Sequence, residues 1–175
     1  AIELKINLYS ILCALLCSEY HCVPHRNIYP KDINKLSMSN TLTITSQNII
    51  NIINLKFTYT LNVNYCNKLL NISNLDMIQE LNLRHCKKIK NIDSLHSLIE
   101  LTIHDSKKIK DVGNLRQLEE LKINNFVTGI HLLKNLKKLH IEKSLCKKMK
   151  MIIKKLQQIN SCFVVKEFVD MEEVD

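Results

Sequence analysis

The 175-residue sequence has few of the residues that make tight turns and rigid loops: it contains two glycines, two prolines and no tryptophan. So few glycines exclude the glycine-rich phosphate loops of nucleotide-binding folds and argue against a sandwich with many tight turns. No apolar run reaches the roughly 18 residues that a membrane span requires. Apolar residues still make up 46% of the chain. We therefore expect a soluble domain with a buried core, whose turns are made largely without glycine or proline.

The seven cysteines do not read as a disulfide framework, because their number is odd and the chain is long enough to fold around a core without cross-links. We expect reduced thiols and an intracellular, cytoplasmic protein. Secretion is the alternative, because residues 8–17 have the length of the hydrophobic region of a signal peptide. The acidic Glu3 ahead of that region and the poor supply of small residues for cleavage favour the cytoplasmic interpretation.

A repeat of about 20 residues organises the middle of the chain. The segment from Glu80 reads ELNLRHCKKIKNIDSLHSLI and the segment from Glu100 reads ELTIHDSKKIKDVGNLRQLE, with their apolar positions superposed without a gap. The leading leucines of the copies are Leu42, Leu61, Leu81, Leu101, Leu121 and Leu139, which are 19, 20, 20, 20 and 18 residues apart. Such regular spacing over five steps indicates a true internal repeat.

Each copy predicts one coil of a solenoid. Its opening alternation of apolar and polar residues predicts a short strand with one buried side. The apolar residues that follow recur every three positions, which suits a 3₁₀-like or extended return segment. Because one coil cannot bury its own apolar side, neighbouring coils must stack, and their strands then pair in parallel. The sequence therefore predicts an α/β solenoid with a parallel sheet.

The pattern Leu81-x-Leu83-x-x-Cys86 resembles the strand motif of the leucine-rich repeat, and the three-residue steps after it look most like the internalin and protein-phosphatase-regulator class. The resemblance covers residues 36–160. It implies a right-handed solenoid whose parallel sheet lies on the concave face, the usual ligand surface in this family. It also implies a structural role for Cys66 and Cys86, which stand at the family's Asn/Cys position, where the side chain bonds backbone in the turn.

Three further copies can be compared at that position. Ser106 and Ser144 could make the same hydrogen bonds, but Phe126 cannot. The copy that contains Phe126 is also two residues short and keeps Gly129. We therefore expect this coil to be irregular.

The ends of the chain predict caps for the solenoid. We divide the chain into a helical N-terminal cap and connector (residues 1–35), the solenoid (36–160) and a C-terminal strand with an acidic tail (161–175). Residues 3–17 have an apolar helical face, and Pro24 and Pro30 mark the connector. Between Leu145 and Ile159 the apolar spacing predicts a helix with Ser144 as its N-cap, followed by a strand at 162–165.

A helical region ahead of leucine-rich repeats also resembles the F-box proteins, whose helices bind a ubiquitin-ligase adaptor. The Leu-Pro pair that opens the F-box motif is missing here, and the segment has room for only one or two helices. A role as a substrate adaptor of this kind is therefore the less favoured alternative.

One cluster near the N-terminus has the residue types of a zinc site: Cys13, Cys17, His21, Cys22 and His25. Residues four apart share a helix face, so several of these side chains could converge on an ion. The spacing matches no known zinc module, and core cysteines with surface histidines explain it as well. We therefore predict no metal site and no other cofactor.

The sequence contains no motif of a reaction centre. Gly-x-Ser-x-Gly, a phosphate loop and His-Glu-x-x-His are all missing from it. Histidines and carboxylates do come together on the predicted sheet, but the repeat alone accounts for that. We therefore expect a protein that is not an enzyme.

The strand register predicts a polar binding surface on the sheet, made of residues beside each leading leucine. Its members are Tyr65, Glu80, Asn82, Arg84, His85, Glu100, Thr102, His104, Asp105, Glu120, Lys122, Asn124, His140 and Glu142. Glu80, Glu100 and Glu120 would lie about 5 Å apart, at a cost of a few tenths of a kcal/mol for each exposed pair. Such a mixed surface suits a protein partner, so we predict an adaptor or effector that recognises a protein.

The alternative is an anion-binding protein that uses lysines stacked along the turn after the strands. These are Lys87, Lys88, Lys90, Lys107, Lys108 and Lys110, joined by Lys147 and Lys148 of the C-terminal helix. The net charge is +8, and such a patch could bind nucleic acid or an anionic membrane. Nucleic-acid sites usually contain arginine and aromatic residues, and this set of lysines contains neither. The lysine bias also has a simpler source in an A/T-rich genome, such as that of a large DNA virus, so a protein partner is favoured.

Overall fold

The computed structural model describes residues 20–22, 41–45, 50, 52, 58–73, 75–160 and 162–168. The expected helix at 3–17, the connector with Pro24 and Pro30, and the tail beyond residue 168 lie outside the described residues. Within the described part of the chain, no helix has both the length and the apolar character needed to cross a bilayer.

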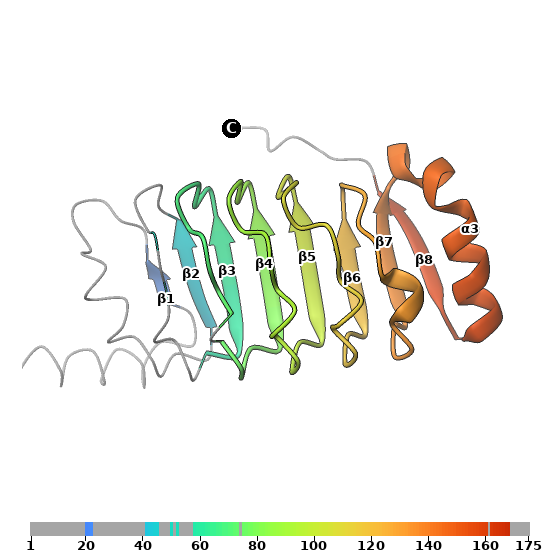
Figure 1. The fold of residues 1–175 in the computed structure, drawn as a ribbon, viewed down its shortest axis with the longest axis horizontal. Coiled ribbons are helices and arrows are strands. Elements are labelled where there is room, and N and C mark those ends of the chain that lie inside the picture. The colour runs from blue at the N-terminus through green and yellow to red at the C-terminus, as the bar shows by residue number, and fades with distance from the viewer. Residues whose placement is uncertain are drawn as a thin grey trace, which may run out of the picture.

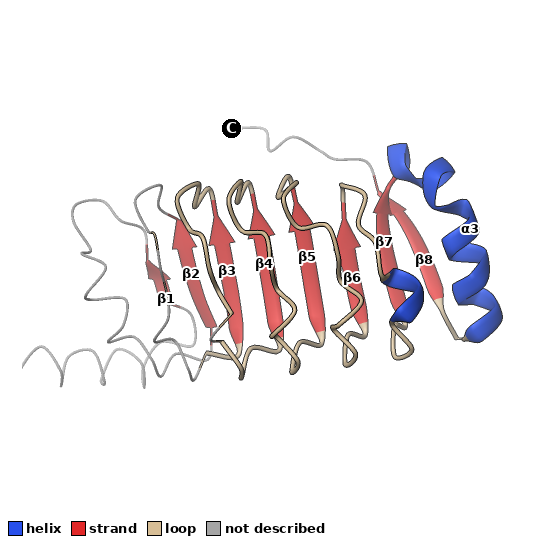
Figure 2. Cartoon of the chain, in the orientation of Figure 1, coloured by secondary structure: helices blue, strands red, loops and turns tan. Residues whose placement is uncertain are grey.

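The described strands form one parallel sheet whose order in space is the order along the chain (Figure 1). They are β1 (Tyr20–Cys22), β2 (Thr41–Thr45), β3 (Thr60–Asn64), β4 (Glu80–Arg84), β5 (Glu100–His104), β6 (Glu120–Ile123), β7 (Lys138–Glu142) and β8 (Val164–Phe168). Because neighbouring strands are parallel, the chain must travel back between them. The return segments of β3 to β6 cross one side of the sheet (Figure 2). The predicted solenoid with a parallel sheet is confirmed, and its sheet extends beyond residues 36–160 at both ends.

The register of the sheet follows the repeat. Leu81 pairs with Leu61 on one side and with Leu101 on the other, and the row continues through Leu121 to Leu139. Every residue in this row is buried, whereas the side chains between them in the strands are more exposed. Stacking the coils thus buries a continuous column of leucine. Burial of each such side chain stabilises the folded state by about 1.5–3 kcal/mol.

The return segments turn in steps of three residues, as predicted. The Leu95 N–H donates to the carbonyl of Ile92 at 3.1 Å, and the Leu98 N–H donates to that of Leu95 at 3.2 Å. Each corner therefore places one apolar side chain inward, and all three are fully buried. This geometry explains how the chain reverses direction repeatedly without glycine or proline.

Buried cysteine and serine side chains stabilise the turns that follow β3, β4 and β5. The Cys86 thiol lies 3.3 Å from the carbonyl oxygen of Val63 in the preceding coil, and the Cys66 thiol lies 3.4 Å from that of Asn64. Ser106 occupies the same position one coil later and accepts the Cys86 N–H at 3.0 Å. The expected bonding of these side chains to backbone is confirmed. Burial raises the pKa of the Cys86 thiol to about 12, so it remains a protonated donor.

The coil after β6 is irregular, as predicted. Phe126 is exposed, and Val127 is buried in its place. Gly129 has a φ of +81° and precedes a short 3₁₀ helix, η1 (Ile130–Leu132). A Cβ at position 129 would lie only 2.4 Å from the backbone nitrogen of Gly113. Glycine is therefore required here for both its conformation and its size.

Helix α3 (Lys143–Ile159) follows β7 without a break and lies at the end of the sheet beside β8 (Figure 2). Its buried residues Leu145, Met149 and Leu156 confirm most of the predicted apolar face, but Ile159, expected at its end, is 63% exposed. The strand expected at 162–165 is present as β8, two residues further along.

The expectation for Ser144 is wrong in both respects. The helix begins at Lys143, one residue before Ser144, with Glu142 as its N-cap. The Ser144 hydroxyl bonds the Glu142 carboxylate at 2.6 Å instead of a backbone group. Because β7 runs directly into α3, this copy has no turn for a buried serine to hold.

Candidate functional site

The side of the sheet opposite the core carries rows of polar side chains in register. We call this surface the ladder face and define it by the strand residues that alternate with the core residues. Its members in β3 to β7 are Thr60, Asn62, Asn64, Glu80, Asn82, Arg84, Glu100, Thr102, His104, Glu120, Lys122, Lys138, His140 and Glu142. The predicted surface residues in the strands therefore do lie on one face.

Hydrogen bonds between neighbouring strands orient the row of polar side chains at the middle of β2, β3 and β4. The Asn82 amide donates to the side-chain oxygen of Asn62 at 2.6 Å. The Asn62 amide in turn donates to the Thr43 hydroxyl at 3.2 Å. Because each of these amides donates to a side chain of the preceding strand, the row presents a defined set of donors and acceptors.

A row of carboxylates crosses the amino ends of the strands, since Glu100 pairs in register with Glu80 and Glu120. The outer members have partners. The Thr60 hydroxyl donates to the Glu80 carboxylate at 3.0 Å, and the Lys138 ammonium donates to the Glu120 carboxylate at 2.7 Å. The row therefore ends in a cation, Lys138, that belongs to β7.

The electrostatics of this row differ from one carboxylate to the next. Partial burial, together with the charges of Glu120 and Glu80, raises the pKa of Glu100. The hydrogen bond from Lys138 holds the pKa of Glu120 below its ordinary value, and His140 Nε2 lies 3.0 Å from the same carboxylate. Glu100 is thus the member of the row whose charge is least favourable.

A second group of side chains gathers at the carboxyl ends of β3, β4 and β5. Tyr65, His85 and Asp105 directly follow these strands, and all three have left-handed backbone, with φ of 57°, 53° and 48°. The Tyr65 ring stacks on the His85 ring with centroids 4.7 Å apart. The His85 ring meets the His104 ring edge to face at 5.5 Å. Three aromatic rings from successive coils therefore lie in contact.

One carboxylate oxygen lies between the two imidazoles of this group. Asp105 Oδ2 is 3.6 Å from His85 Nδ1 and 3.5 Å from His104 Nδ1. The backbone supports the arrangement, because the His85 N–H donates to the His104 carbonyl at 2.9 Å and the Asp105 N–H donates to the Asn124 side chain at 2.9 Å. We call His85, His104 and Asp105 the histidine–aspartate cluster.

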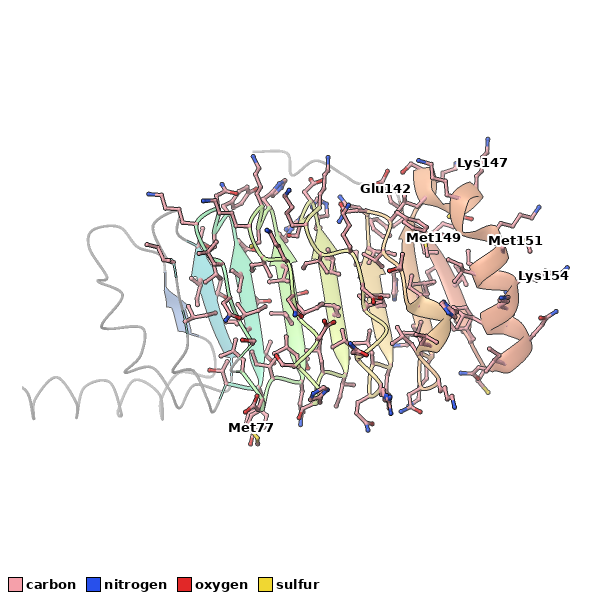
Figure 3. The ribbon with its side chains drawn as sticks, viewed as in Figure 1. Met77, Glu142, Lys147, Met149, Met151 and Lys154 are labelled. Atoms are coloured by element: carbon pink, nitrogen blue, oxygen red, sulfur yellow. The ribbon has the colours of Figure 1, made fainter. Side chains whose placement is uncertain are left out.

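A hollow of about 440 Å³ adjoins this cluster, lined by His85, Lys87, Asp105, Lys107 and Lys108. The structure thus brings three of the predicted anion-binding lysines together. It does not bring Lys147 and Lys148 to the same place, because they lie on α3 at the end of the sheet. Figure 3 shows Lys147 pointing away from the sheet. The predicted lysine set is therefore divided between two surfaces.

Two contacts on the ladder face were not anticipated from the sequence. The Lys122 ammonium lies 4.8 Å from the centre of the Phe168 ring, so an aromatic residue of β8 borders the face. Lys138 continues the row of glutamates in β7. It precedes Leu139 as each glutamate precedes its own leading leucine, so the repeat could have predicted this position. Phe168 lies outside the repeat and left no such signal.

Most of the cysteine–histidine cluster near the N-terminus lies outside the described residues, namely Cys13, Cys17 and His25. His21 and Cys22 belong to strand β1, so the helical spacing does not continue to His21. No protein-family model matches this chain. No curated protein matches it either.

Proposed function

We propose that this chain is a non-enzymatic leucine-rich-repeat module of the cytoplasm that recognises a protein partner through its ladder face. The observation that carries the proposal is the set of in-register polar rows across β3 to β7. Such rows combine amide groups, carboxylates and cations at fixed spacing on a rigid support. Because the sheet already orders these side chains, little conformational entropy would be lost when a partner with complementary groups binds.

The proposed kinship with leucine-rich repeats is supported by the turn after each strand. Cys66, Cys86 and Ser106 bond backbone groups there, which is the role of the family's Asn/Cys residue. A right-handed path is supported by the strong general preference of parallel crossover connections for that hand. Cys86, Cys146 and Cys162 form no disulfide, which suits a reducing compartment.

The proposal is tested by capturing partners from cells with the tagged full chain and two charge-reversed variants. The face variant carries Glu100→Lys and Lys122→Glu, which leave the net charge unchanged. The control variant carries Lys107→Glu and Lys108→Glu, beside the hollow. We expect the face variant to lose a partner that the wild type and the control variant retain, with the melting temperature of all three nearly the same. Loss in the control variant alone would contradict the proposal.

The second candidate function is binding of an anionic polymer or surface. It is favoured by one observation, the three lysines that line the hollow. The discriminating measurement is the affinity of the chain for RNA or for anionic vesicles as salt is raised. Non-specific attraction to lysines falls steeply as salt is raised. Affinity for RNA or vesicles that persists above about 0.2 M salt would therefore indicate a specific anion site and would favour this candidate over protein recognition.

A further inference from the structure

We propose that the histidine–aspartate cluster is a divalent metal site that binds Zn²⁺ through two imidazole nitrogens and one carboxylate oxygen. The site goes beyond the proposed recognition function and does not depend on it. His85 and Asp105 occupy the same position in successive copies of the repeat, and His104 precedes Asp105 in the chain. Because neighbouring coils stack in register, these three side chains meet at the ends of β4 and β5.

The donor set fits zinc. The ligand atoms of His85, His104 and Asp105 all lie within 4.8 Å of one another. Imidazole nitrogen and carboxylate oxygen are both ordinary ligands of Zn²⁺, and sites with three protein ligands leave a coordination position for water or another ligand. Two imidazoles with one carboxylate form such a three-ligand set.

The spacing of the donor atoms fits a tetrahedral ion. The Asp105 Oδ2 atom lies 3.5 Å from His104 Nδ1 and 3.6 Å from His85 Nδ1. Ligand atoms at ordinary Zn–N and Zn–O distances lie about 3.3 Å apart around a tetrahedral ion and about 2.9 Å apart around an octahedral one. The two observed distances are therefore closer to the edges of a tetrahedron than to those of an octahedron.

The protein holds the three ligands before any ion arrives. The Tyr65 ring lies flat against the His85 ring, at an interplanar angle of 11°. The left-handed turns at His85 and Asp105 set the direction of both side chains, and the Asn124 side chain fixes the second turn through its hydrogen bond. Ligands preorganised on a rigid sheet lose little freedom when an ion binds.

The neighbouring lysines set what else can reach the ion. Asp105 offsets only one of the two charges of a zinc ion, and Lys87, Lys107 and Lys108 add positive charge around the hollow. These lysines are exposed, so they can turn toward solvent. When their ammonium groups face the hollow instead, they would favour an anionic fourth ligand, such as a carboxylate or hydroxide, that enters through it.

The test is calorimetric titration of the full chain with Zn²⁺. The matched variants Asp105→Asn and His104→Gln keep the size of each side chain, and asparagine tolerates the left-handed backbone at position 105. Two control variants, His131→Gln and Cys162→Ser, remove an exposed histidine and an exposed thiol elsewhere. We expect one high-affinity zinc ion per chain, an affinity at least tenfold weaker in both cluster variants, and no change in the controls.

Two further readouts do not depend on the variants. Co²⁺ bound in place of Zn²⁺ should give the visible spectrum of a four-coordinate ion without a thiolate charge-transfer band, and long-range ¹H–¹⁵N spectra of the wild type should show an ion on two imidazole nitrogens. The proposal is overturned if the wild type binds no zinc, if both cluster variants bind it as tightly as the wild type, or if a thiolate band shows that cysteines hold the ion.

Discussion

The hydroxyl of Ser106 forms hydrogen bonds with backbone groups of its own coil and of the preceding coil. It is fully buried, accepts the backbone N–H of Cys86, and lies within hydrogen-bond distance of the Leu83 and His104 carbonyls. In the preceding copy the buried Cys86 has the same place and a backbone hydrogen bond with Cys66. Serine and cysteine are therefore interchangeable here because both can donate and accept in the turn.

We predict that Ser106→Ala lowers the free energy of unfolding by about 1–3 kcal/mol, because it leaves the Cys86 N–H buried without an acceptor. Ser106→Cys should cost less, since Cys86 already fills this position one coil earlier. Chemical denaturation of the three proteins measures both effects. Equal losses for alanine and cysteine would contradict the role assigned to the side chain.

Two carboxylates of the glutamate row should respond to pH with opposite signs. Folding raises the pKa of Glu100, so the folded state binds that proton more tightly and ionisation of Glu100 reduces stability as pH rises through this range. Glu100→Gln should therefore raise the free energy of unfolding at pH 7 by about 0.5 kcal/mol, and the gain should disappear in acid, where the carboxyl is protonated.

Glu120→Gln is the matched control for this measurement. The bond from Lys138 lowers the pKa of Glu120, so its stabilising effect is present above the unfolded pKa and is lost as pH falls through the folded pKa. This variant should be less stable than the wild type at pH 7. Denaturation curves at several pH values would refute the account if both variants shifted stability in the same direction.

At the scale of elements, α3 closes the end of the solenoid with one face. Met149 is fully buried, whereas Met151, two residues further along, is 72% exposed. Figure 3 labels both on the helix. Burial thus alternates around α3, as expected of a helix that covers the end of a core.

This difference predicts the outcome of two otherwise identical substitutions. Met149→Ala should lower the free energy of unfolding by about 2–5 kcal/mol, because it leaves a cavity against the last coils. Met151→Ala should change it by less than about 0.5 kcal/mol. Thermal or chemical denaturation compares them directly, and similar losses for the two would show that α3 does not cap the core in this way.

At the scale of the whole molecule, the repeat predicts the stacking because a fixed period places equivalent residues in adjacent strands. Leu81 and Leu101 pair as their 20-residue spacing requires. The repeat places His85, His104 and Asp105 on the same predicted surface, but it does not predict that their donor atoms converge. That convergence needs left-handed backbone at His85 and Asp105, which the repeat pattern does not specify. The start of α3 also escaped prediction, since Glu142 and Ser144 are both polar enough to begin a helix.

The solenoid is a stack in which each coil packs on its neighbours. A second copy of residues 80–99, inserted after residue 99, should then form one more coil and lengthen the sheet by about 4.8 Å. A shuffled insert of the same composition is the control, and it should disrupt the stack.

The most direct test is the chemical denaturation of this duplicated chain, followed by circular dichroism. We predict a cooperative transition at a denaturant concentration equal to or above that of the original chain. A duplicated chain that is unfolded, or no more stable than the shuffled control, would contradict the stacking of interchangeable 20-residue coils.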